Sequence, residues 1–337
     1  MYKVISLFSG CGGLDLGFKR AGFEIIWANE YDKDIWATYK ANHVGVRLDT
    51  RDIGDIPLNE VPACDGIIGG PPCQPWSEGG KMLGIVDERG QVFCDYIRVL
   101  NAKKPLFFVL ENVPGMLQAV HGGILEEFKK MFQMIGYKLT QERLNAANFR
   151  VPQDRERLFF VGVRKDLHRF YKFPVSTTSK QVSLREAIGD ITEAPRLYKN
   201  NELVTYNAER LNHDCYVGEY DSKYMARNRV RSWNERSFTI QALAKNAPIH
   251  PQAPKMLFVN SNKRIFVPGK EALYRRLSVR ECARIQTFPD SFEFFYSDIR
   301  AGYKMVGNAV PVRLAYAIAI AMKSMLDLGG IHEFMVP

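Results

Sequence analysis

The sequence predicts an α/β fold: a doubly wound, mostly parallel sheet with a smaller, irregular, strand-rich domain beside it. Two observations predict it. Through residue 165, short apolar runs alternate with segments whose apolar residues have helical spacing, which is the pattern of βαβ units covered on both faces. From residue 166 onward this alternation gives way to Pro, Asn and Thr with short strand-like pieces. The 337 residues are enough for one large or two ordinary domains.

The expected strands are short apolar runs that end in turn residues. They lie at 4–9, 23–30, 46–50, 65–70, 105–113 and 157–163. Helical order returns after residue 273 and ends in a long amphipathic segment at 310–326. Because that helix needs a sheet to cover, we expect a large domain from residues 1–165, an inserted domain from 166–272, and a return segment, 273–337, that completes the large domain.

Cysteine usage and hydropathy limit the setting. The six cysteines are scattered and form no CxxC pair, which argues against a disulfide framework and against a structural zinc site, and fits a reducing cytoplasm. No apolar run approaches the length of a membrane span, and the first residues lack the layout of a signal peptide. We therefore expect a cytoplasmic protein without metal or membrane contact.

The positive charge is concentrated in one segment. Residues 223–270 hold ten Lys or Arg and a single acid, Glu235. This segment accounts for the whole net charge of +9, because the rest of the chain has equal numbers of basic and acidic residues. Aromatic and β-branched residues such as Trp233 and Ile240 interleave with these cations, so the segment is folded rather than a charged tail. A positive block on a neutral body favours a face that binds a polyanion, and a solvated surface is the weaker alternative.

A glycine-rich turn follows the first expected strand, in LFSGCGGLDLGF at 7–18. Gly10 and Gly12 allow a tight turn and a close approach of backbone to ligand. Glu30 ends the second strand, where a carboxylate can bind both hydroxyls of a ribose. Tyr31 offers a flat face to a purine, and Asp52, after the third strand, can accept from an exocyclic amine.

The turn favours S-adenosylmethionine over a dinucleotide. The dinucleotide fingerprint requires glycine at position 15, where this chain has Asp15. An acid in that turn repels pyrophosphate, whereas S-adenosylmethionine has ribose and adenine without phosphate. On this motif alone, plain turn chemistry remains the alternative.

Cys73 stands in GGPPCQPWSEGG, residues 69–80, after an apolar run. A loop at a strand end of an open sheet is exposed, and a nucleophilic thiolate needs an exposed, electropositive setting. The Pro and Gly neighbours argue against a buried, inert thiol. That commoner role is assigned to four other cysteines: Cys64, Cys94, Cys215 and Cys282.

A carboxyl group and two guanidinium groups complete the candidate chemistry. Glu111 follows six apolar residues, beside a cavity where burial would raise its pKa and let it donate a proton. Arg155 and Arg157, two apart at a strand start, could hold one oxygen of a planar substrate. This set suits methylation of cytosine carbon 5: a thiolate adds to carbon 6, an acid engages nitrogen 3, and arginine holds oxygen 2.

These motifs, in this order, closely resemble the DNA (cytosine-5) methyltransferase family along nearly the whole chain. They are FSGCGG (8–13), ANEYD (28–32), GGPPCQPWS (69–77), ENV (111–113), QDRER (153–157), LSVRECARIQTFPD (277–290) and YKMVGNAVP (303–311). The resemblance implies that Cys73 is the nucleophile and Glu111 the acid, and that Arg155 and Arg157 bind the base and order the loop. It implies a cofactor site of Phe8, Gly10, Gly12, Glu30, Tyr31, Asp52, Pro71 and Asn308.

The resemblance also assigns functions to the domains. It makes 166–272 the target-recognition domain and the remainder the catalytic domain, and it implies a cytosine flipped out of duplex DNA. Alternating arginines at 227, 229 and 231 would share a face of a strand. We expect one or two of Arg227, Arg229 and Arg231 to read bases, since arginine on guanine is the commonest specific contact. The others would bind phosphate.

Within the family, the chain is similar to the HaeIII-type bacterial modification methylases, which act on GGCC. Those relatives tend to carry Gly-Arg where this chain has Ala244 and Lys245. Exchanging a planar guanidinium for an ammonium puts the GGCC site in doubt. Lys245 remains a candidate DNA contact, and we expect a monomer that works beside a separate restriction endonuclease.

Three other functions are weighed. A zinc cytosine deaminase needs H-x-E and P-C-x-x-C, and Trp76 stands where the second cysteine should be. A tRNA cytosine-5 methyltransferase shares the motifs and differs mainly in the smaller domain, where the basic block favours DNA. A catalytically silent DNA-binding module is disfavoured by the intact set of Cys73, Glu111 and Arg155.

Overall fold

The computed structural model describes residues 1–71, 88–117, 122–176, 181–199, 201–205 and 209–328. The chain forms two compact units. Unit 1 comprises Met1–Asn145, Glu156–Thr177 and Leu314–Pro337, and unit 2 comprises Ala146–Arg155 and Thr178–Arg313. Residues 273–313 therefore group with unit 2, whereas the sequence analysis attached them to the large domain; the functional division at 165 and 272 stays a prediction.

Unit 1 is built on a seven-stranded sheet in the order β3-β2-β1-β4-β5-β7-β6. The strands from β3 to β5 in this order pair in parallel, and β7 and β6 pair antiparallel. The strands are β1 (Lys3–Leu7), β2 (Glu24–Asn29), β3 (Arg47–Asp49), β4 (Gly66–Gly69), β5 (Phe107–Asn112), β6 (Tyr137–Asn145) and β7 (Glu156–Arg164). The helices are α1 (Gly13–Arg20), α2 (Lys33–Asn42), α3 (Glu88–Lys103), α4 (Gly122–Met134) and α9 (Val312–Leu328).

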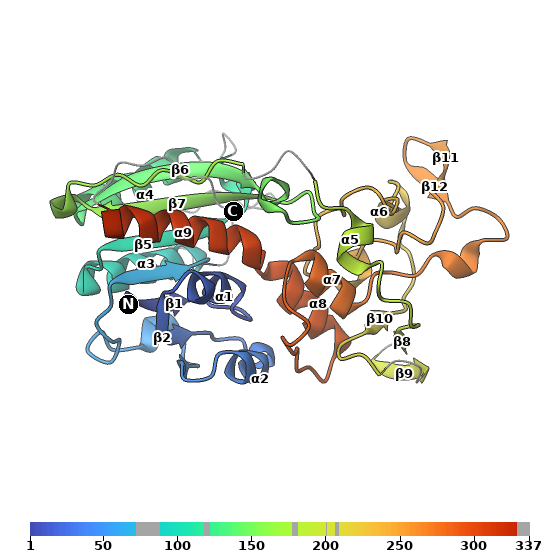
Figure 1. Ribbon diagram of the computed structural model, residues 1–337, viewed down its shortest axis with the longest axis horizontal. Helices are drawn as coiled ribbons and strands as arrows, with labels where there is room; N and C mark the ends of the chain where they lie inside the picture. The colour runs from blue at the N-terminus through green and yellow to red at the C-terminus, as the bar shows by residue number, and fades with distance from the viewer. Residues whose placement is uncertain (72–87, 118–121, 177–180, 200, 206–208, 329–337) are drawn as a thin grey trace. The chain divides into compact units, whose positions relative to one another are not determined.

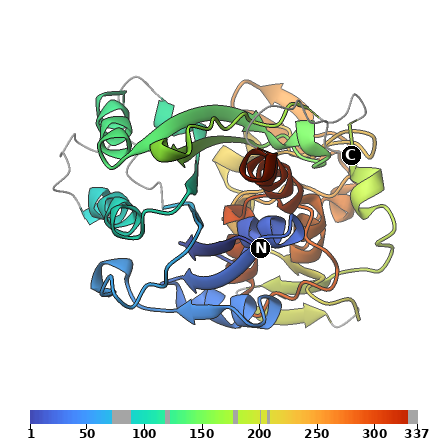
Figure 2. The same ribbon diagram turned by 60° about the vertical axis from the view of Figure 1, so that its left-hand side comes forward.

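Helices cover both faces of this sheet (Figures 1 and 2). On one face, Phe108 of β5 contacts Tyr96 of α3 and Phe132 of α4 through ring pairs. On the other, Phe107 contacts Phe18 of α1. Successive residues of a strand point to opposite faces, so a strand buried on both faces reads as a continuous apolar run. That is why the sequence of β5 showed no alternation.

The expected fold class is confirmed, and the six expected strands correspond to β1, β2, β3, β4, β5 and β7. The strand β6, Tyr137–Asn145, was missed. Most of its side chains are exposed or half-buried because it lies at the edge of the sheet and pairs with β7 alone. An edge strand of this kind has a polar sequence, YKLTQERLN, that gives no apolar run to detect.

The helical stretch Ile299–Asp327, which comprises α8 (Ile299–Asn308) and most of α9, is long and apolar enough by composition to cross a membrane, but 67% of its most apolar 18-residue window is buried within the molecule. Its C-terminal part is α9, which packs closely on α1 in unit 1. A Cβ atom at Gly17 would lie 2.3 Å from the Cβ of Ala315, so the glycine is what permits this contact. The stretch is therefore a core helix of a folded protein.

Unit 2 is a set of short elements. It contains a three-stranded sheet in the order β10-β8-β9 and a separate two-stranded hairpin of β11 and β12. The strands are β8 (Arg196–Lys199), β9 (Glu202–Thr205), β10 (Asp214–Tyr216), β11 (Leu257–Asn260) and β12 (Lys263–Ile265). The helices are α5 (Leu184–Ile188), α6 (Ser222–Met225), α7 (Val279–Ile285) and α8 (Ile299–Asn308).

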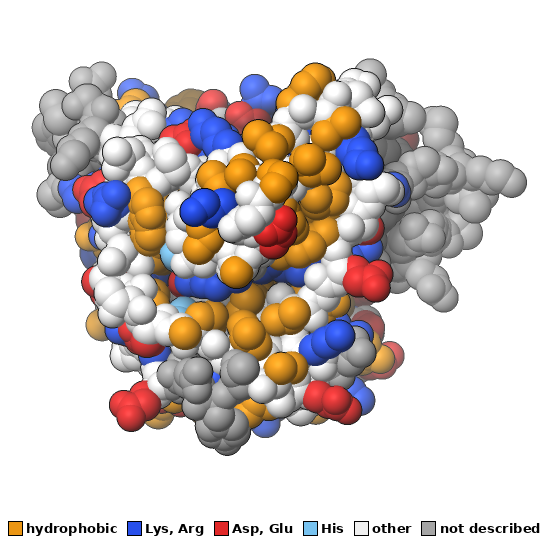
Figure 3. Space-filling view, turned by 90° about the vertical axis from the view of Figure 1, so that its right-hand side faces the viewer, with side chains coloured by type: hydrophobic (Ala, Val, Ile, Leu, Met, Phe, Trp, Pro, Cys, Tyr) orange, Lys and Arg blue, Asp and Glu red, His pale blue; other side chains and the backbone are white. Residues whose placement is uncertain are grey.

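The hairpin β11–β12 carries apolar side chains in the open. Phe258 is 66% exposed, and Leu257, Val259 and Ile265 are exposed as well. Figure 3 faces this side of the molecule and shows hydrophobic side chains gathered with Lys and Arg among them. The Arg264 guanidinium lies over the Phe258 ring and donates to the carbonyl of Ala226 at 2.9 Å, which ties the hairpin to the segment after α6.

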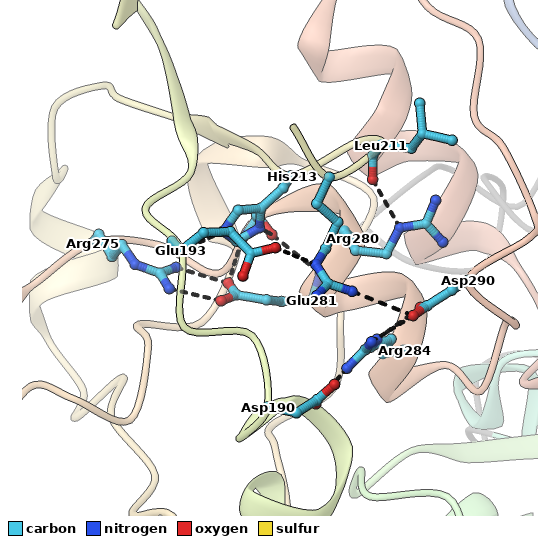
Figure 4. A network of polar contacts seen from close by, with 11 residues as sticks. Asp190, Glu193, Leu211, His213, Arg275, Arg280, Glu281, Arg284 and Asp290 are labelled. Atoms are coloured by element: carbon cyan, nitrogen blue, oxygen red, sulfur yellow. Dashed lines mark hydrogen bonds and ion pairs between the residues drawn. The ribbon is translucent and has the colours of Figure 1, made fainter. Parts of the chain in front are cut away.

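A buried polar network organises the centre of unit 2 around α7 (Figure 4). Glu281 is fully buried and accepts two hydrogen bonds of 2.7 Å from the guanidinium of Arg275. It also closes a capping box with Ser278 at the start of α7. His250 Nε2 lies 3.5 Å from Glu281 Oε1, and His213 Nδ1 lies 2.9 Å from the Ser278 hydroxyl. The network thus joins segments on both sides of the hairpin in sequence.

This network makes stability depend on pH. Burial lowers the pKa of His250 to about 4, against the opposing charge of Glu281. Burial raises the pKa of Glu281, but the charge and hydrogen bonds of Arg275 outweigh burial and lower it to about 2. Both groups bind protons more readily in the unfolded chain, so stability is lost on acidification: first through His250 below about pH 6.5, then through Glu281 below about pH 4.5.

We expect the free energy of unfolding to fall by about 1 to 2 kcal/mol between pH 7 and pH 5 through His250 alone. Denaturant unfolding at both pH values should show a smaller loss in His250→Gln, which cannot titrate. His168→Asn, on a loop of unit 1, should keep the wild-type loss. Equal losses in the wild type and in His250→Gln would contradict the assignment.

Candidate active site

The glycine-rich turn after β1 has a backbone that few sequences allow. Phe8, Gly10 and Gly12 all have positive φ, at 53°, 55° and 84°. A Cβ at Gly10 would meet no atom within 4 Å, so open space lies beside the turn. Phe8 adopts the left-handed conformation despite its side chain, which costs energy. Residues in such strained conformations cluster at functional sites.

The cofactor candidates Glu30, Tyr31 and Asp52 follow the ends of the next two strands. The Glu30 carboxylate accepts hydrogen bonds from the backbone N–H groups of Gly10 and Asp32, each at 2.8 Å. A carboxylate has about four acceptor positions, so it can also take ribose hydroxyls. Tyr31 presents a ring that is 69% exposed, and Asp52 caps a short turn by accepting from Gly54 N–H at 2.8 Å. These residues fit S-adenosylmethionine.

The Asp15 side chain is directed into the interior, so one of the two reasons given above for excluding a dinucleotide, direct repulsion of pyrophosphate by an exposed acid, is wrong; the missing glycine at position 15 still stands. Its carboxylate is fully buried and accepts from the hydroxyls of Ser6 at 2.7 Å and Tyr39 at 2.6 Å. Burial raises its pKa, against the lowering effects of His43 and of these hydroxyls. The acid belongs to the interior of unit 1, where Ser6 and Tyr39 bind it.

Glu111 and Arg157 form a nearly buried ion pair at the ends of β5 and β7. Arg157 Nε lies 2.9 Å from Glu111 Oε1, with side-chain exposures of 13% and 12%. Gly70, directly after β4, borders the pair: a Cβ there would lie 2.9 Å from Glu111 Oε2. Pro71 is buried next to it, and the candidate nucleophile Cys73 lies outside the described residues.

Arg155 has a different environment from Arg157. Its side chain is 0% exposed, and it donates to the carbonyls of Ile240, Gly307 and Ala309 at 2.8 to 2.9 Å. All of these groups are in unit 2. Two of the carbonyls flank Asn308, whose side chain is exposed at the end of α8. The guanidinium therefore fixes the turn that presents Asn308, and the two arginines do not share one face of a strand.

Gln153 and Gln286 extend this arrangement, and sequence reasoning assigned neither of them a role. Gln153 accepts from Ile240 N–H at 2.7 Å and donates to Gln286 Oε1 at 2.9 Å. Gln286 donates in turn to the carbonyl of Val306 at 2.9 Å. The motifs at 153–157, 277–290 and 303–311 are thus joined by buried side-chain amides. Their spacing in the sequence could not reveal this, because two of the three contacts involve backbone groups and the third joins residues 133 positions apart.

The three alternating arginines differ in their contacts. Arg229 donates to the carbonyl of Tyr224 at 2.9 Å and lies over its ring. Arg231 pairs with Glu235 at 3.2 Å and with Asp154 at 3.5 Å. The expected strand is absent from the described residues 226–232, where only Val230 makes an isolated bridge. The side chains therefore do not alternate between two sheet faces.

Lys245 is held near α6 by a second buried arginine. Arg276 donates to the carbonyls of Lys245, Gly218 and Glu219 at 2.9 to 3.1 Å. The Lys245 ammonium lies 3.3 Å from Asp221, the residue that caps α6. Arg276 therefore joins the segment before α6 to the segment that carries Lys245.

Part of the basic block is neutralised and part is open. Asp154, from outside the block, pairs with Arg236 at 3.0 Å as well as with Arg231. In the portion of the chain that the structure describes, no acid lies within ion-pair distance of Arg227, Lys263 or Lys270, and all three are exposed. These side chains are free to contact a polyanion.

The same described portion holds no group of three or more His, Cys, Asp or Glu side chains that could bind a metal ion. Its cysteines Cys11, Cys64, Cys94, Cys215 and Cys282 are all reduced. Burial raises the pKa of Cys64 and Cys215 to about 12, so both are protonated at neutral pH. That agrees with the inert role expected of them.

Comparison with known proteins gives a consistent result. Residues 2–324 match the family model described as C-5 cytosine-specific DNA methylase. The chain is 49% identical over 334 residues to the type II methyltransferase M.NgoPII of Neisseria gonorrhoeae, covering 96% of each chain. It is 50% identical over 329 residues to M.FnuDI of Fusobacterium nucleatum, covering 96% of this chain and 95% of the relative.

Solved structures share the fold at lower identity. A putative prophage-encoded DNA modification methyltransferase of E. coli superposes with a TM-score of 0.72 at 23% identity, over 97% of this chain and all of that one. The Spodoptera frugiperda DNMT2 superposes with a TM-score of 0.66 at 18% identity, over 97% and 100%. These likenesses concern the fold alone.

The contact between Gly70 and Glu111 predicts an effect of a single methyl group. In Gly70→Ala the new Cβ must displace the Glu111 carboxylate from Arg157, so we expect kcat to fall roughly 10- to 100-fold, as a misplacement of about 1 Å does. Steady-state kinetics should show little change in KM. Gly123→Ala, whose Cβ meets nothing within 4 Å on α4, is the matched control. A kcat near wild type in Gly70→Ala would show that the carboxylate position does not limit turnover.

Proposed function

The chain belongs to the C-5 cytosine-specific DNA methylase family, and from this premise we propose that it is the modification enzyme of a bacterial restriction–modification system. It is a DNA (cytosine-5)-methyltransferase and uses S-adenosylmethionine. The observation that carries the proposed chemistry is the Glu111–Arg157 pair beside Gly70. Gly70 stands three residues before the candidate nucleophile in sequence. Gly70 follows β4 and Glu111 lies near the end of β5, at the carboxyl ends of parallel strands, where open sheets place their ligands.

The pair fits one edge of a cytosine ring. Nitrogen 3 and oxygen 2 of the base are neighbours, and the carboxyl and guanidinium groups in contact at 2.9 Å can engage one each. Glu111 would hold a proton at nitrogen 3, and Arg157 would bind oxygen 2. Both contacts stabilise the charge that develops when a nucleophile adds to the ring.

We assign the nucleophile to Cys73. Its thiolate forms a bond to carbon 6, and the electrons of the 5,6 double bond move to make carbon 5 nucleophilic. Bound S-adenosylmethionine supplies an electrophilic methyl group to carbon 5. A base then removes the carbon 5 proton, the double bond re-forms, and the sulfur leaves. The cytosine must be flipped out of the duplex, because a stacked base is closed to the thiol.

Phe8, Gly10, Gly12, Glu30, Tyr31, Asp52, Pro71 and Asn308 are proposed to hold the cofactor. Their support is chemical: a turn with open space beside Gly10, a carboxylate braced by backbone N–H groups, and an exposed aromatic ring. For Arg155 we propose an indirect role. Its contacts with Gly307 and Ala309 order the turn that presents Asn308.

Arg227 is our candidate for reading a base, and Lys245 for a second DNA contact. Arg229 and Arg231 already have partners within the protein, so we propose that they shape the surface on which Arg227 stands. Lys263 and Lys270 would contact phosphates. The GGCC site remains a hypothesis, because Lys245 replaces the arginine of the HaeIII-type enzymes.

Three features of context complete the proposal: the enzyme acts as a cytoplasmic monomer, with a restriction endonuclease as a separate partner. The reduced cysteines support the location. The names of the relatives, type II methyltransferases, support the endonuclease. The tRNA methyltransferase alternative rests on the shared motifs, and methylation assays on duplex DNA and on tRNA distinguish the two.

Cys73→Ser should abolish methyl transfer and leave cofactor binding intact, because the hydroxyl is a far weaker nucleophile at neutral pH. Transfer of a radiolabelled methyl group to duplex DNA measures the first, and calorimetry with S-adenosylhomocysteine measures the second. In the presence of S-adenosylmethionine, the wild type should also form a covalent complex with duplex DNA that contains 5-fluorocytosine, because the methylated adduct has no proton to lose from carbon 5. Turnover by the serine variant, or no complex with the wild type, would remove the mechanism.

Arg227→Ala and Lys263→Ala should separate base reading from phosphate binding. Bisulfite sequencing of plasmid DNA identifies the methylated site, and duplexes with and without that site are then titrated at several salt concentrations. Arg227→Ala should lose about 1 to 3 kcal/mol on the specific duplex only. Lys263→Ala should weaken both duplexes alike and reduce the salt slope by about one. Identical behaviour of the two variants would contradict this assignment.

A further inference from the structure

A buried histidine lies directly behind the glycine-rich turn of unit 1 and has no part in the mechanism above. His43 caps the C-terminal end of α2 and is 1% exposed. Its Nε2 atom lies 3.2 Å from the carbonyl oxygen of Cys11, in the middle of the turn. In the tautomer with its proton on Nε2, the ring donates a hydrogen bond to that carbonyl.

The backbone of the turn also packs against this ring. A Cβ at Gly12 would lie 2.0 Å from His43 Nε2 and 2.5 Å from Cε1. Gly12 has a φ of 84°, a conformation that glycine adopts without cost. The imidazole thus occupies the space that a side chain at position 12 would need, and it supports both the carbonyl of one residue and the Cα of the next.

The histidine is itself held by a buried cluster. Its ring stacks on Tyr39 with centroids 4.3 Å apart and an interplanar angle of 19°. The Tyr39 hydroxyl donates to Asp15 at 2.6 Å, and Ser6 on β1 donates to the other Asp15 oxygen at 2.7 Å. Burial lowers the pKa of His43, against the opposing charge of Asp15. The ring is therefore neutral at physiological pH, as a donor to a carbonyl should be.

The turn is braced on its other side by Glu30. That carboxylate accepts from Gly10 N–H at 2.8 Å, and Glu30 precedes α2 as His43 follows it. One helix therefore supplies an anchor at each of its ends. Glu30 is also the residue expected to bind ribose, so it contacts both the turn and the ligand. His43 contacts the turn from the interior, where it is closed to solvent.

We propose that His43 is a positioning residue for S-adenosylmethionine: it holds Cys11 and Gly12 in the conformation that leaves the open side of the turn shaped for the cofactor. The proposal rests on the proposed cofactor site. It predicts an effect on affinity for the cofactor and none on the chemistry at Glu111, because Glu111 lies at the end of β5 whereas the turn follows β1.

Three variants test it. His43→Phe keeps the ring stack and removes the donor, which leaves the Cys11 carbonyl without this hydrogen bond. His43→Gln keeps an amide donor at similar reach. Tyr39→Phe is the matched control, because it removes a buried hydrogen bond of the same cluster to Asp15 and leaves the contact with Cys11 in place. Calorimetry with S-adenosylhomocysteine gives the dissociation constant, thermal unfolding gives stability, and kinetics give kcat and the cofactor KM.

We expect His43→Phe to weaken S-adenosylhomocysteine binding about tenfold or more and to raise the cofactor KM similarly, with kcat at saturation within about twofold of wild type. His43→Gln should restore most of the affinity. Tyr39→Phe should lower the unfolding temperature and leave the affinity unchanged. If His43→Phe does not fold, His43→Asn, whose amide is too short to reach the carbonyl, takes its place with the same expected loss.

Wild-type affinity in the variant that lacks the donor would overturn the proposal. So would equal losses of affinity in all three variants, in proportion to their losses of stability, because that pattern indicates a general structural role. A wild-type protein that fails to bind S-adenosylhomocysteine would instead contradict the cofactor site itself, so the two failures are distinguishable.

Discussion

The guanidinium of Arg155 is a full charge with no exposed surface, and unit 2 is arranged to accommodate it. A buried cation without partners is very costly, so backbone carbonyls must be brought to it and kept there. Those carbonyls come from Ile240, Gly307 and Ala309, which are far apart in sequence. The segment around Ile240 and the C-terminal end of α8 are therefore joined through one side chain. If either moved, the guanidinium would lose hydrogen bonds while it remained buried.

Unit 1 follows a different rule, in which the parallel sheet itself gathers the site. The carboxyl ends of parallel strands meet at one edge of a sheet, so the turn after β1, Glu30 after β2, Gly70 after β4 and Glu111 in β5 converge without any single organising contact. Position 70 requires glycine because a Cβ there would lie too close to the Glu111 carboxylate. Gly12 is under the same steric constraint, because a Cβ there would overlap the His43 ring.

The sequence alone predicted the convergence of residues at the strand ends of the parallel sheet. It did not predict the contacts of buried side chains with backbone groups, such as those of Arg155. Strands buried on both faces produce apolar runs, and Gly10 and Glu30 stand where such runs end, so the fold class and the cofactor turn were within reach. Arg155 was not, because its partners are backbone carbonyls and β7 begins only at Glu156. The expectation that Arg227, Arg229 and Arg231 share one face came from a predicted strand, whereas the chain there is irregular. Arg229 and Arg231 bond within the protein. Hydrogen bonds and ion pairs of this kind produce no periodic pattern in the sequence.

The segment 153–155 binds in two directions at once. Gln153 and Arg155 hold the turn that presents Asn308. Asp154, between them, pairs with Arg231 and Arg236 and accepts at its carbonyl from the Thr239 hydroxyl. The surface proposed to read DNA and the turn proposed to meet the cofactor are thus anchored to three consecutive residues of one extended stretch. A change that displaces the backbone of this stretch would therefore reach both surfaces within unit 2.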